Sequence, residues 1–313
     1  MRLVFMGTPE FSLPSLETLV RAGYAIETVV TGPDKPRGRG RESAPTPVKV
    51  AALSHGIPLL QPASTRDPAF AEALRERAPE LIVVVAFRIL PPSIIALPSR
   101  GAFNLHASLL PRYRGAAPIN WALINGERRT GVTTFFLEEK VDTGEIIHQR
   151  EVPIEDDDDA GSLHDRLAAV GAELVLETVR SIEAGNPPRR LQDPSRATPA
   201  PKIFREHCVI PWEQPAEEIR NLIRGLAPHP GAFTLHRGAV MKLFRGVVEL
   251  SRTGLAPGEI HSSEEQLLVG TGSTALSVIE LQQEGRRRME VREFLRGYRF
   301  APGDRFSSGP VDG

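Results

Sequence analysis

LIVVVAF, residues 81–87, is the stretch that decides the fold of this chain. A continuous apolar run rich in β-branched side chains is typical of a strand that is buried on both faces. Strands of this kind occur in parallel sheets whose two faces are covered by helices. The run is also far shorter than a membrane-spanning helix requires. We therefore expect residues 81–87 to form a central strand of an α/β domain.

Strand and helix patterns alternate on both sides of this run. Further strand patterns occupy residues 2–7, 25–31, 102–108, 131–138 and 145–153, and helix patterns occupy residues 13–23, 46–56, 67–79 and 117–127. Thr46 with Pro47, and Asp67 with Pro68, each pair an N-cap side chain with a proline that suits the first helical turn. This alternation predicts right-handed crossovers and an open, mostly parallel sheet with flanking helices.

A long helix pattern over residues 156–185 follows the last of these strands, with Leu163, Leu167, Val170 and Leu174 at helical spacing. Four aspartates, residues 156–159, precede its apolar face. They could be metal ligands, but no further ligand pattern follows them. Negative charge at the positive N-terminus of a helix is the simpler interpretation, and we favour it.

A second domain follows a linker rich in Pro and Arg. We place the catalytic α/β domain at residues 1–185, the linker at 186–203 and the second domain at 204–313. The second domain combines a helix pattern with short strand patterns separated by glycines: 216–227, 231–236, 239–250, 258–262, 266–271 and 275–282. Short strands at close spacing predict a small β-barrel, of which an OB-like barrel is one form.

Composition limits the class of protein. The chain has 313 residues, a formal net charge of −1 and a single cysteine, Cys208. This length favours about two domains, and the charge argues against a uniformly basic nucleic-acid binder. One cysteine cannot form an intrachain disulfide. The apolar run at the N-terminus is too short for a signal peptide, so we expect a cytoplasmic protein.

Cofactor and metal motifs have little support. LLVGTGSTA, residues 267–275, matches a dinucleotide-binding glycine pattern, but the residues after it alternate as a strand rather than continuing as a helix, which favours a hairpin turn. No Walker A pattern occurs. The eight histidines include no pair four residues apart, so we expect no metal site.

A basic loop lies between the strand at 25–31 and the helix that starts at Pro47. Lys35, Arg37, Arg39 and Arg41 alternate within it. The loop could simply be a solvated surface segment. It could also bind a polyanion, because open α/β sheets bind ligands at the carboxyl ends of their strands. Arg189 and Arg190 in the linker, with residues 286–288, would extend such a surface.

Two polar residues interrupt the apolar strand pattern at 102–108. Asn104 and His106 share one face of an extended strand. They could form a hydrogen-bonded pair that serves structure alone. Alternatively, a carboxamide N–H can stabilise an oxyanion and an imidazole can move a proton, with Asp142 in a later turn orienting the imidazole. No Ser or Cys nucleophile accompanies them, which favours direct acyl transfer between two bound substrates.

These segments resemble the folate-dependent formyltransferases. The resemblance is carried by FNLHASLLPRYRGAAPINWA from residue 103, VDTGEII from 141, MGTPEF from 6 and the basic loop. It continues after the linker with GLAPHPGA, MKLFRG and PGEI. The Asn-x-His-x-Ser-Leu-Leu-Pro segment with its downstream Asp-Thr-Gly marks the superfamily, and the basic loop and the barrel narrow the resemblance to members that act on tRNA.

The resemblance implies transfer of a formyl group from 10-formyltetrahydrofolate, without a metal, to the α-amino group of methionine on initiator tRNA. It implies three catalytic residues, Asn104, His106 and Asp142, and tRNA contacts by Arg39 and by the second domain. It also implies that the segment Ser108, Leu109, Leu110 and Pro111 contacts the folate. We expect Lys35, Arg37 and Arg41 to contact tRNA as well, and the protein to be a monomer.

Two alternatives stay open at this point: a formyltransferase that acts on a small amine, such as glycinamide ribonucleotide or an amino sugar, and a non-catalytic RNA-binding relative. The role of His106, as a base or as an oxyanion donor, is also open. Two segments depart from the pattern of the family. AFRILPP, residues 86–92, differs near the expected folate pocket, and His229 stands where tryptophan is common.

Overall fold

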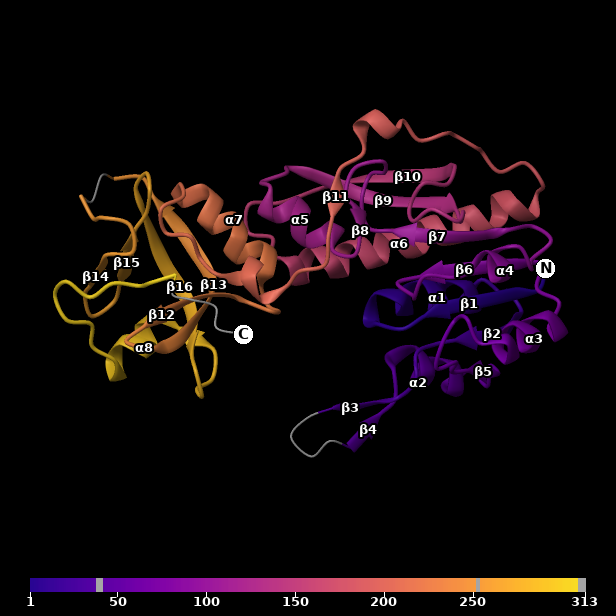
Figure 1. The fold of residues 1–313 in the computed structure, drawn as a ribbon, viewed down its shortest axis with the longest axis horizontal. Helices are drawn as coiled ribbons and strands as arrows, with labels where there is room; N and C mark the ends of the chain where they lie inside the picture. The colour runs from indigo at the N-terminus through magenta and orange to yellow at the C-terminus, as the bar shows by residue number, and fades with distance from the viewer. Residues whose placement is uncertain (38–41, 252–253, 309–313) are drawn as a thin grey trace. The chain divides into compact units, whose positions relative to one another are not determined.

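The computed structural model describes residues 1–37, 42–251 and 254–308 (Figure 1). The chain divides into two compact units. The first unit contains Met1–Ala116, Arg129–Pro153 and His164–Ala200, and the second contains Ala117–Arg128, Ile154–Leu163 and Pro201–Gly313. Two segments that precede the linker therefore pack with the second unit, and the contiguous boundaries at 185 and 203 stay a prediction.

The first unit is built on one seven-stranded sheet. Its strands in spatial order are β10 (Ile146–Pro153), β9 (Arg129–Phe136), β7 (Ala102–His106), β6 (Leu81–Val85), β1 (Leu3–Gly7), β2 (Ile26–Val30) and β5 (Leu59–Leu60). The strands from β7 to β5 pair in parallel, whereas β9 pairs antiparallel with both β7 and β10. The predicted open, mostly parallel sheet is confirmed, and residues 81–85 lie at its centre with every side chain buried.

Four helices connect these strands: α1 (Leu13–Arg21), α2 (Pro47–Ser54), α3 (Pro68–Glu76) and α4 (Pro92–Ile95). A fifth helix, α6 (Ala160–Glu183), follows β10. Both predicted helix starts are confirmed, since the side chain of Thr46 accepts a hydrogen bond from Lys49 N at 3.1 Å and that of Asp67 accepts one from Ala69 N at 3.0 Å. Short α4 and β5 have no clear pattern in the sequence.

The two faces of the sheet pack against different helices. Residues from α3 and α4 bury Val4, Met6, Ile82 and Val84 on one face. On the other face, α6 approaches β7 so closely that a Cβ on Gly171 would lie 2.6 Å from Leu105 Cδ2. Because strand side chains alternate, Asn104 and His106 point away from α6, at the carboxyl end of β7.

Two of the aspartates before α6 accept hydrogen bonds from backbone N–H groups. Asp159 Oδ1 accepts a hydrogen bond from Ser162 N at 2.9 Å, and Asp158 Oδ2 accepts one from Glu155 N at 2.7 Å. The first contact satisfies a backbone donor in the first turn of α6, whereas the second lies in the turn before the helix. Among the described residues, no group of three or more His, Cys, Asp and Glu side chains could hold a metal ion.

The second unit contains an antiparallel half-barrel. Its strands are β12 (Ala232–His236), β13 (Ala239–Glu249), β16 (Ala275–Gln283), β15 (Leu267–Gly270) and β14 (Ile260–Ser262), with β17 (Met289–Glu290) paired to β16. Helices α5 (Pro118–Ile124), α7 (Ala216–Leu226) and α8 (Val291–Gly297) complete the unit. Gly270 pairs with Ala275 across the turn, so the glycine pattern at 267–275 is a hairpin, as predicted.

A C-terminal segment, residues 304–307, joins the two ends of this sheet. Ser307 exchanges backbone hydrogen bonds with Leu235 of edge strand β12, and Asp304 O accepts one from Ile260 N of β14 at the opposite edge. Phe306 stacks against Trp212 in the core with ring centroids 5.7 Å apart. The segment therefore covers strand edges that would otherwise be unpaired.

His236 is buried beneath this segment. Its Nδ1 lies 2.6 Å from Tyr298 Oη, and its Nε2 lies 3.1 Å from Asp304 Oδ2, which also receives Arg237. Burial lowers the pKa of His236 below its ordinary value, and the Asp304 carboxylate opposes this. Backbone donation from Ala301 lowers the pKa of Asp304. Both groups therefore bind protons more readily in the unfolded chain than in the folded chain.

Because of this site, we expect the free energy of unfolding to decrease as the pH decreases. A histidine with a depressed folded-state pKa contributes stability that is fully present above its unfolded pKa of about 6.5 and is lost as the pH falls below it. Asp304 acts in the same direction at lower pH. Calorimetric melting temperatures should thus drop between about pH 7.5 and pH 5.5, and drop less in His236→Gln. Equal drops in both proteins would contradict this.

Candidate active site

Asn104 projects from β7 at the carboxyl end of the parallel strands, beside Val84 of β6 and Phe135 of β9. The side chain is half-buried. Among the described residues, no hydrogen bond joins its carboxamide to another protein group. A partly buried amide without a partner costs free energy unless water or a ligand satisfies it, which favours a ligand-binding role over a structural pair.

His106 is 6% exposed, and a hydrogen bond holds one nitrogen of its ring. Its Nε2 lies 2.8 Å from the carbonyl oxygen of Tyr113. A carbonyl can only accept, so Nε2 carries a proton and donates it. Tyr113 has a φ of 60°, a left-handed conformation that places its carbonyl in this position. In the neutral ring, the nitrogen left to accept a proton is therefore Nδ1.

Asp142 faces this nitrogen. Its Oδ2 lies 3.8 Å from His106 Nδ1 and accepts a hydrogen bond from Gly115 N at 2.9 Å. The carboxylate is 10% exposed and sits on a residue with a φ of 56° in the loop between β9 and β10. The predicted neighbours His106 and Asp142 thus meet, and each is held by the short segment 113–115.

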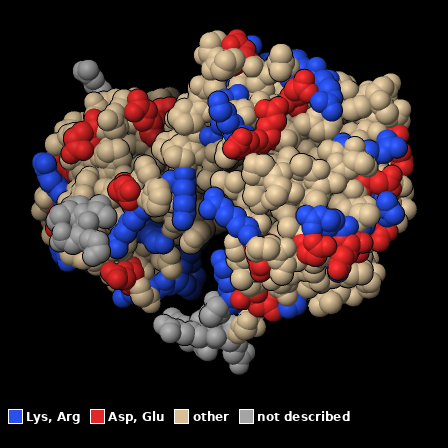
Figure 2. Space-filling view, turned by 45° about the vertical axis from the view of Figure 1, so that its right-hand side comes forward, with Lys and Arg blue, Asp and Glu red and all other residues tan. Residues whose placement is uncertain are grey.

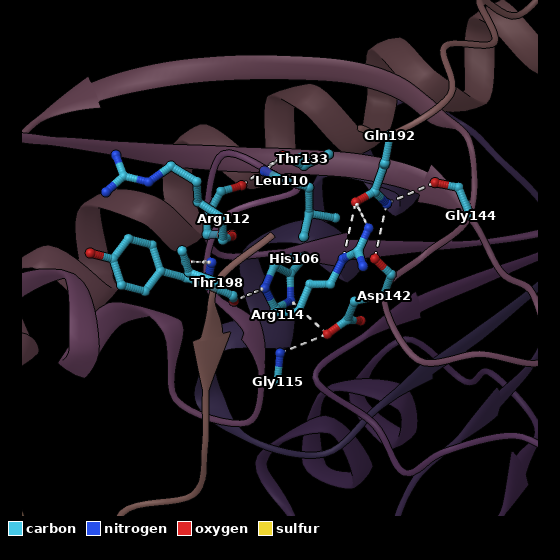
Figure 3. A network of polar contacts seen from close by, with 12 residues as sticks. His106, Leu110, Arg112, Arg114, Gly115, Thr133, Asp142, Gly144, Gln192 and Thr198 are labelled. Carbon is cyan, nitrogen blue, oxygen red and sulfur yellow. Dashed lines mark hydrogen bonds and ion pairs between the residues drawn. The ribbon is translucent and has the colours of Figure 1, made fainter. Parts of the chain in front are cut away.

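The linker supplies residues that sequence reasoning missed. Gln192 Nε2 donates to the carbonyl oxygens of Asp142 at 2.9 Å and Gly144 at 2.8 Å, while its Oε1 accepts from Arg114 Nη2 at 2.7 Å (Figure 3). Thr198 Oγ1 accepts a hydrogen bond from Tyr113 N at 2.9 Å. The Pro- and Arg-rich sequence of this segment predicts a linker between two domains, and no pattern in it indicates these contacts.

Known proteins are similar in sequence to this chain over nearly its whole length. The pattern of the family described as "Formyl transferase" matches residues 1–179, and that of "Formyl transferase, C-terminal domain" matches residues 202–299. The chain belongs to the formyl transferase family. It is thus a formyl-transferring enzyme, and the family takes its formyl group from 10-formyltetrahydrofolate.

Individual relatives support this membership. The methionyl-tRNA formyltransferase of Caldanaerobacter subterraneus subsp. tengcongensis is 48% identical over 97% of this chain and 99% of its own. That of Geobacter sulfurreducens is 47% identical over 100% and 99%. An N-formyltransferase from Helicobacter canadensis, solved with folinic acid and dTDP-3-aminofucose, has the same fold, with a TM-score of 0.68 at 19% identity over 92% of this chain and 99% of that one.

The segment predicted to contact folate in this formyl transferase follows β7 directly. Ser108 is fully buried and its Oγ donates to Arg112 O at 2.6 Å, while Leu110 is packed in an apolar cluster with Phe135 and Ile146. Leu109 and Pro111 are half-buried. Thr133 joins the segment to β9 by donating to Ser108 O and accepting from Leu110 N. Folate contacts by this segment stay a prediction, with Leu109 and Pro111 as its more accessible side chains.

The loop at 86–92, where this chain departs from the family pattern, lies at the carboxyl end of β6. Arg88 donates to the carbonyl oxygens of Ala63 at 2.8 Å and Pro62 at 2.7 Å, and its guanidinium lies 5.2 Å from the centre of the Phe87 ring. Arg88 thus anchors the loop to the segment after β5. The neighbouring Ile89 is 71% exposed.

The basic loop forms a hairpin of β3 (Lys35–Arg37) and β4 (Glu42–Ala44) that projects from the first unit (Figure 1). Lys35 is exposed at its base. For Arg37 the structure gives the backbone alone, and Arg39 and Arg41 lie outside the described residues. At the start of the hairpin, Asp34 accepts from Lys49 Nζ and Gln61 Nε2, and these hydrogen bonds lower the pKa of its carboxyl group.

Four of the other arginines that would extend a basic surface have side-chain partners. Arg189 pairs with Glu145 at 2.8 Å, and Arg190 donates to Gln149. In the second unit, Arg287 pairs with Glu293 and Arg288 with Glu280. Figure 2 shows Lys and Arg interspersed with Asp and Glu over the visible surface, in keeping with the net charge of −1. No helix in the described part of the chain is long and apolar enough to span a membrane.

Proposed function

We propose that this enzyme transfers a formyl group from 10-formyltetrahydrofolate to the α-amino group of methionine on initiator tRNA, with Asn104, His106 and Asp142 as the catalytic residues. The observation that carries the site assignment is the half-buried Asn104 carboxamide. It has no hydrogen-bond partner among the described protein groups and lies on the same face of β7 as the buried His106. Its N–H groups can therefore donate to a substrate oxygen.

The reaction forms one C–N bond and breaks another. The amine nitrogen attacks the formyl carbon, and the formyl oxygen becomes an oxyanion in the tetrahedral intermediate. The Asn104 carboxamide donates to this oxygen. The amine nitrogen loses a proton, N10 of the folate gains one, and the C–N10 bond breaks. The products are the formylated amine and tetrahydrofolate.

His106 and Asp142 provide the proton path in this proposal. Because Tyr113 O holds the Nε2–H of His106, a proton from the amine is accepted at Nδ1, the nitrogen that faces Asp142 Oδ2 at 3.8 Å. The carboxylate stabilises the resulting positive charge on the imidazolium. The hydrogen bond from Gly115 N occupies one lone pair of the Asp142 carboxylate. The remaining lone pairs can accept the proton that is passed to the leaving nitrogen.

Two observations support tRNA as the acceptor. Relatives aligned over nearly the whole chain are named methionyl-tRNA formyltransferases. The segment 35–41, which follows β2 in the sequence, also contains Lys35 and three arginines within seven residues. In this proposal, Lys35, Arg37, Arg39 and Arg41 contact the phosphates of the tRNA, and the enzyme acts as a cytoplasmic monomer.

An acceptor panel tests the function. Purified enzyme is given 10-formyltetrahydrofolate with methionyl initiator tRNA, methionyl elongator tRNA, glycinamide ribonucleotide or an amino sugar. We expect turnover with the initiator tRNA alone. Formylation of a small amine would replace the proposed substrate, and tRNA binding without turnover would reject the catalytic role.

The hairpin arginines should make tRNA binding dependent on salt. Each phosphate contact contributes about one unit to the slope of log K against log salt concentration, so changing Arg37, Arg39 and Arg41 together to Ala should reduce the slope by up to about 3. The slope is measured by titrating tRNA at several salt concentrations.

A triple variant of exposed arginines elsewhere on the first unit, Arg21, Arg66 and Arg75, is the matched control, since it removes the same charge. An unchanged slope in the hairpin variant, or an equal change in the control, would reject phosphate contacts by the hairpin.

A further inference from the structure

We infer that the linker segment 192–200, the linker strap, positions the catalytic site. Gln192 and Thr198 are its positioning residues. The inference rests on the proposed catalytic roles of His106 and Asp142. Neither strap residue contacts these side chains directly. Each acts through the short segment 113–115 or through the loop that bears Asp142.

One end of the strap holds the Asp142 loop. Gln192 Nε2 bridges two carbonyl oxygens of this loop, those of Asp142 and Gly144, and both distances are within 2.9 Å. A non-glycine residue at a φ of 56° is in a sparsely populated conformation and needs such support. Arg114, in turn, donates to Gln192 Oε1 through Nε and Nη2 and so orients the amide, with its N–H groups toward the loop.

The other end of the strap holds the partner of His106. Thr198 Oγ1 accepts from Tyr113 N, Thr198 O accepts from Arg114 N at 2.8 Å, and β11 (Pro199–Ala200) pairs in parallel with β8 (Arg114–Gly115). These contacts fix the Tyr113 carbonyl that receives His106 Nε2–H. They also fix the Gly115 N–H that donates to Asp142 Oδ2.

The contact between strap and site leaves no room for a side chain. A Cβ on Gly115 would lie 2.6 Å from Ala200 O, and the φ of this glycine is 125°, which other residues rarely adopt. The strap therefore lies directly against the backbone whose N–H positions Asp142. A linker that acted only as a spacer would need neither this close approach nor hydrogen bonds from both ends.

A double-mutant cycle tests whether Gln192 acts through Asp142. We expect Gln192→Ala to lower kcat by about 10- to 100-fold with little change in KM for either substrate, because a small displacement of a catalytic group is costly. In an Asp142→Asn background the same change should have little further effect, because the charge that Gln192 positions is gone. Multiplicative losses in the double variant would overturn the inference.

Leu191→Ala is the control for the linker. Leu191 directly precedes the strap and is 81% exposed, so we expect kcat to be unchanged. Thr198→Val, which removes the acceptor for Tyr113 N, should lower kcat, and Thr198→Ser, which keeps the hydroxyl, should restore it. Equal losses in the Val and Ser variants would also reject the inference.

A second measurement does not depend on the acceptor. The ¹⁵N chemical shifts of the His106 ring report which nitrogen carries the proton. They should change in Gln192→Ala and Thr198→Val at constant pH and stay unchanged in Leu191→Ala. If the wild-type enzyme formylates none of the amines tested, the proposed function fails, and these shifts still decide the inference: shifts identical to wild type in both strap variants would overturn it.

Discussion

Asn104→Ala should lower the single-turnover rate of formyl transfer by about 10²- to 10³-fold, the loss seen when a preorganised oxyanion donor is removed. Asn104 is the polar side chain of β7 that has no protein partner in the described part of the chain, so it can donate to the developing oxyanion. The rate is measured with enzyme in excess over methionyl initiator tRNA, which isolates the chemical step from product release.

The variant should keep the fold. The side chain is half-buried, and its truncation removes no hydrogen bond to another described residue, so the melting temperature should change little. Asn104→Asp is the sharper comparison, since it keeps the size of the side chain but replaces the N–H donors with a charged acceptor. It should be at least as slow as Asn104→Ala. A near-normal rate in either variant would exclude the oxyanion role.

Asp142→Asn should lower the single-turnover rate by about 10²-fold or more, within the range that positioned acid–base groups contribute. Asparagine tolerates the left-handed backbone at this position and can still accept from Gly115 N, so the substitution removes the charge and little else. Without that charge, the His106 imidazolium loses its counterion. The rate is measured by rapid quenching across a range of pH.

Glu145→Gln provides the matched control. Glu145 lies three residues along the same loop, and its carboxylate pairs with Arg189 at 2.8 Å. Removing this charge should leave the rate close to that of the wild type. If Asp142→Asn reacted as fast as Glu145→Gln, Asp142 would have no part in proton transfer.

Local patterns predicted much of this fold. The buried run at 81–85 predicted a central parallel strand, because a strand covered on both faces needs no polar alternation. Thr46 and Asp67 predicted helix starts, because an N-cap depends on a few adjacent residues. The hairpin at 267–275 was also predictable, since turn chemistry is local. The division into units was not, because segments 117–128 and 154–163 pack with residues far along the chain.

The sequence by itself determined that Asn104 and His106 share one face of a strand, because side chains in an extended chain alternate whatever surrounds them. It also carried the motifs that relate this chain to the formyl transferases. Only the tertiary structure decided which groups hold His106 and Asp142. Asp142 lies 27 residues from Gly115, and Gln192 lies 50 residues from Asp142. Contacts across such separations depend on backbone carbonyls and N–H groups that every residue possesses, so no residue type marks them before the chain has folded.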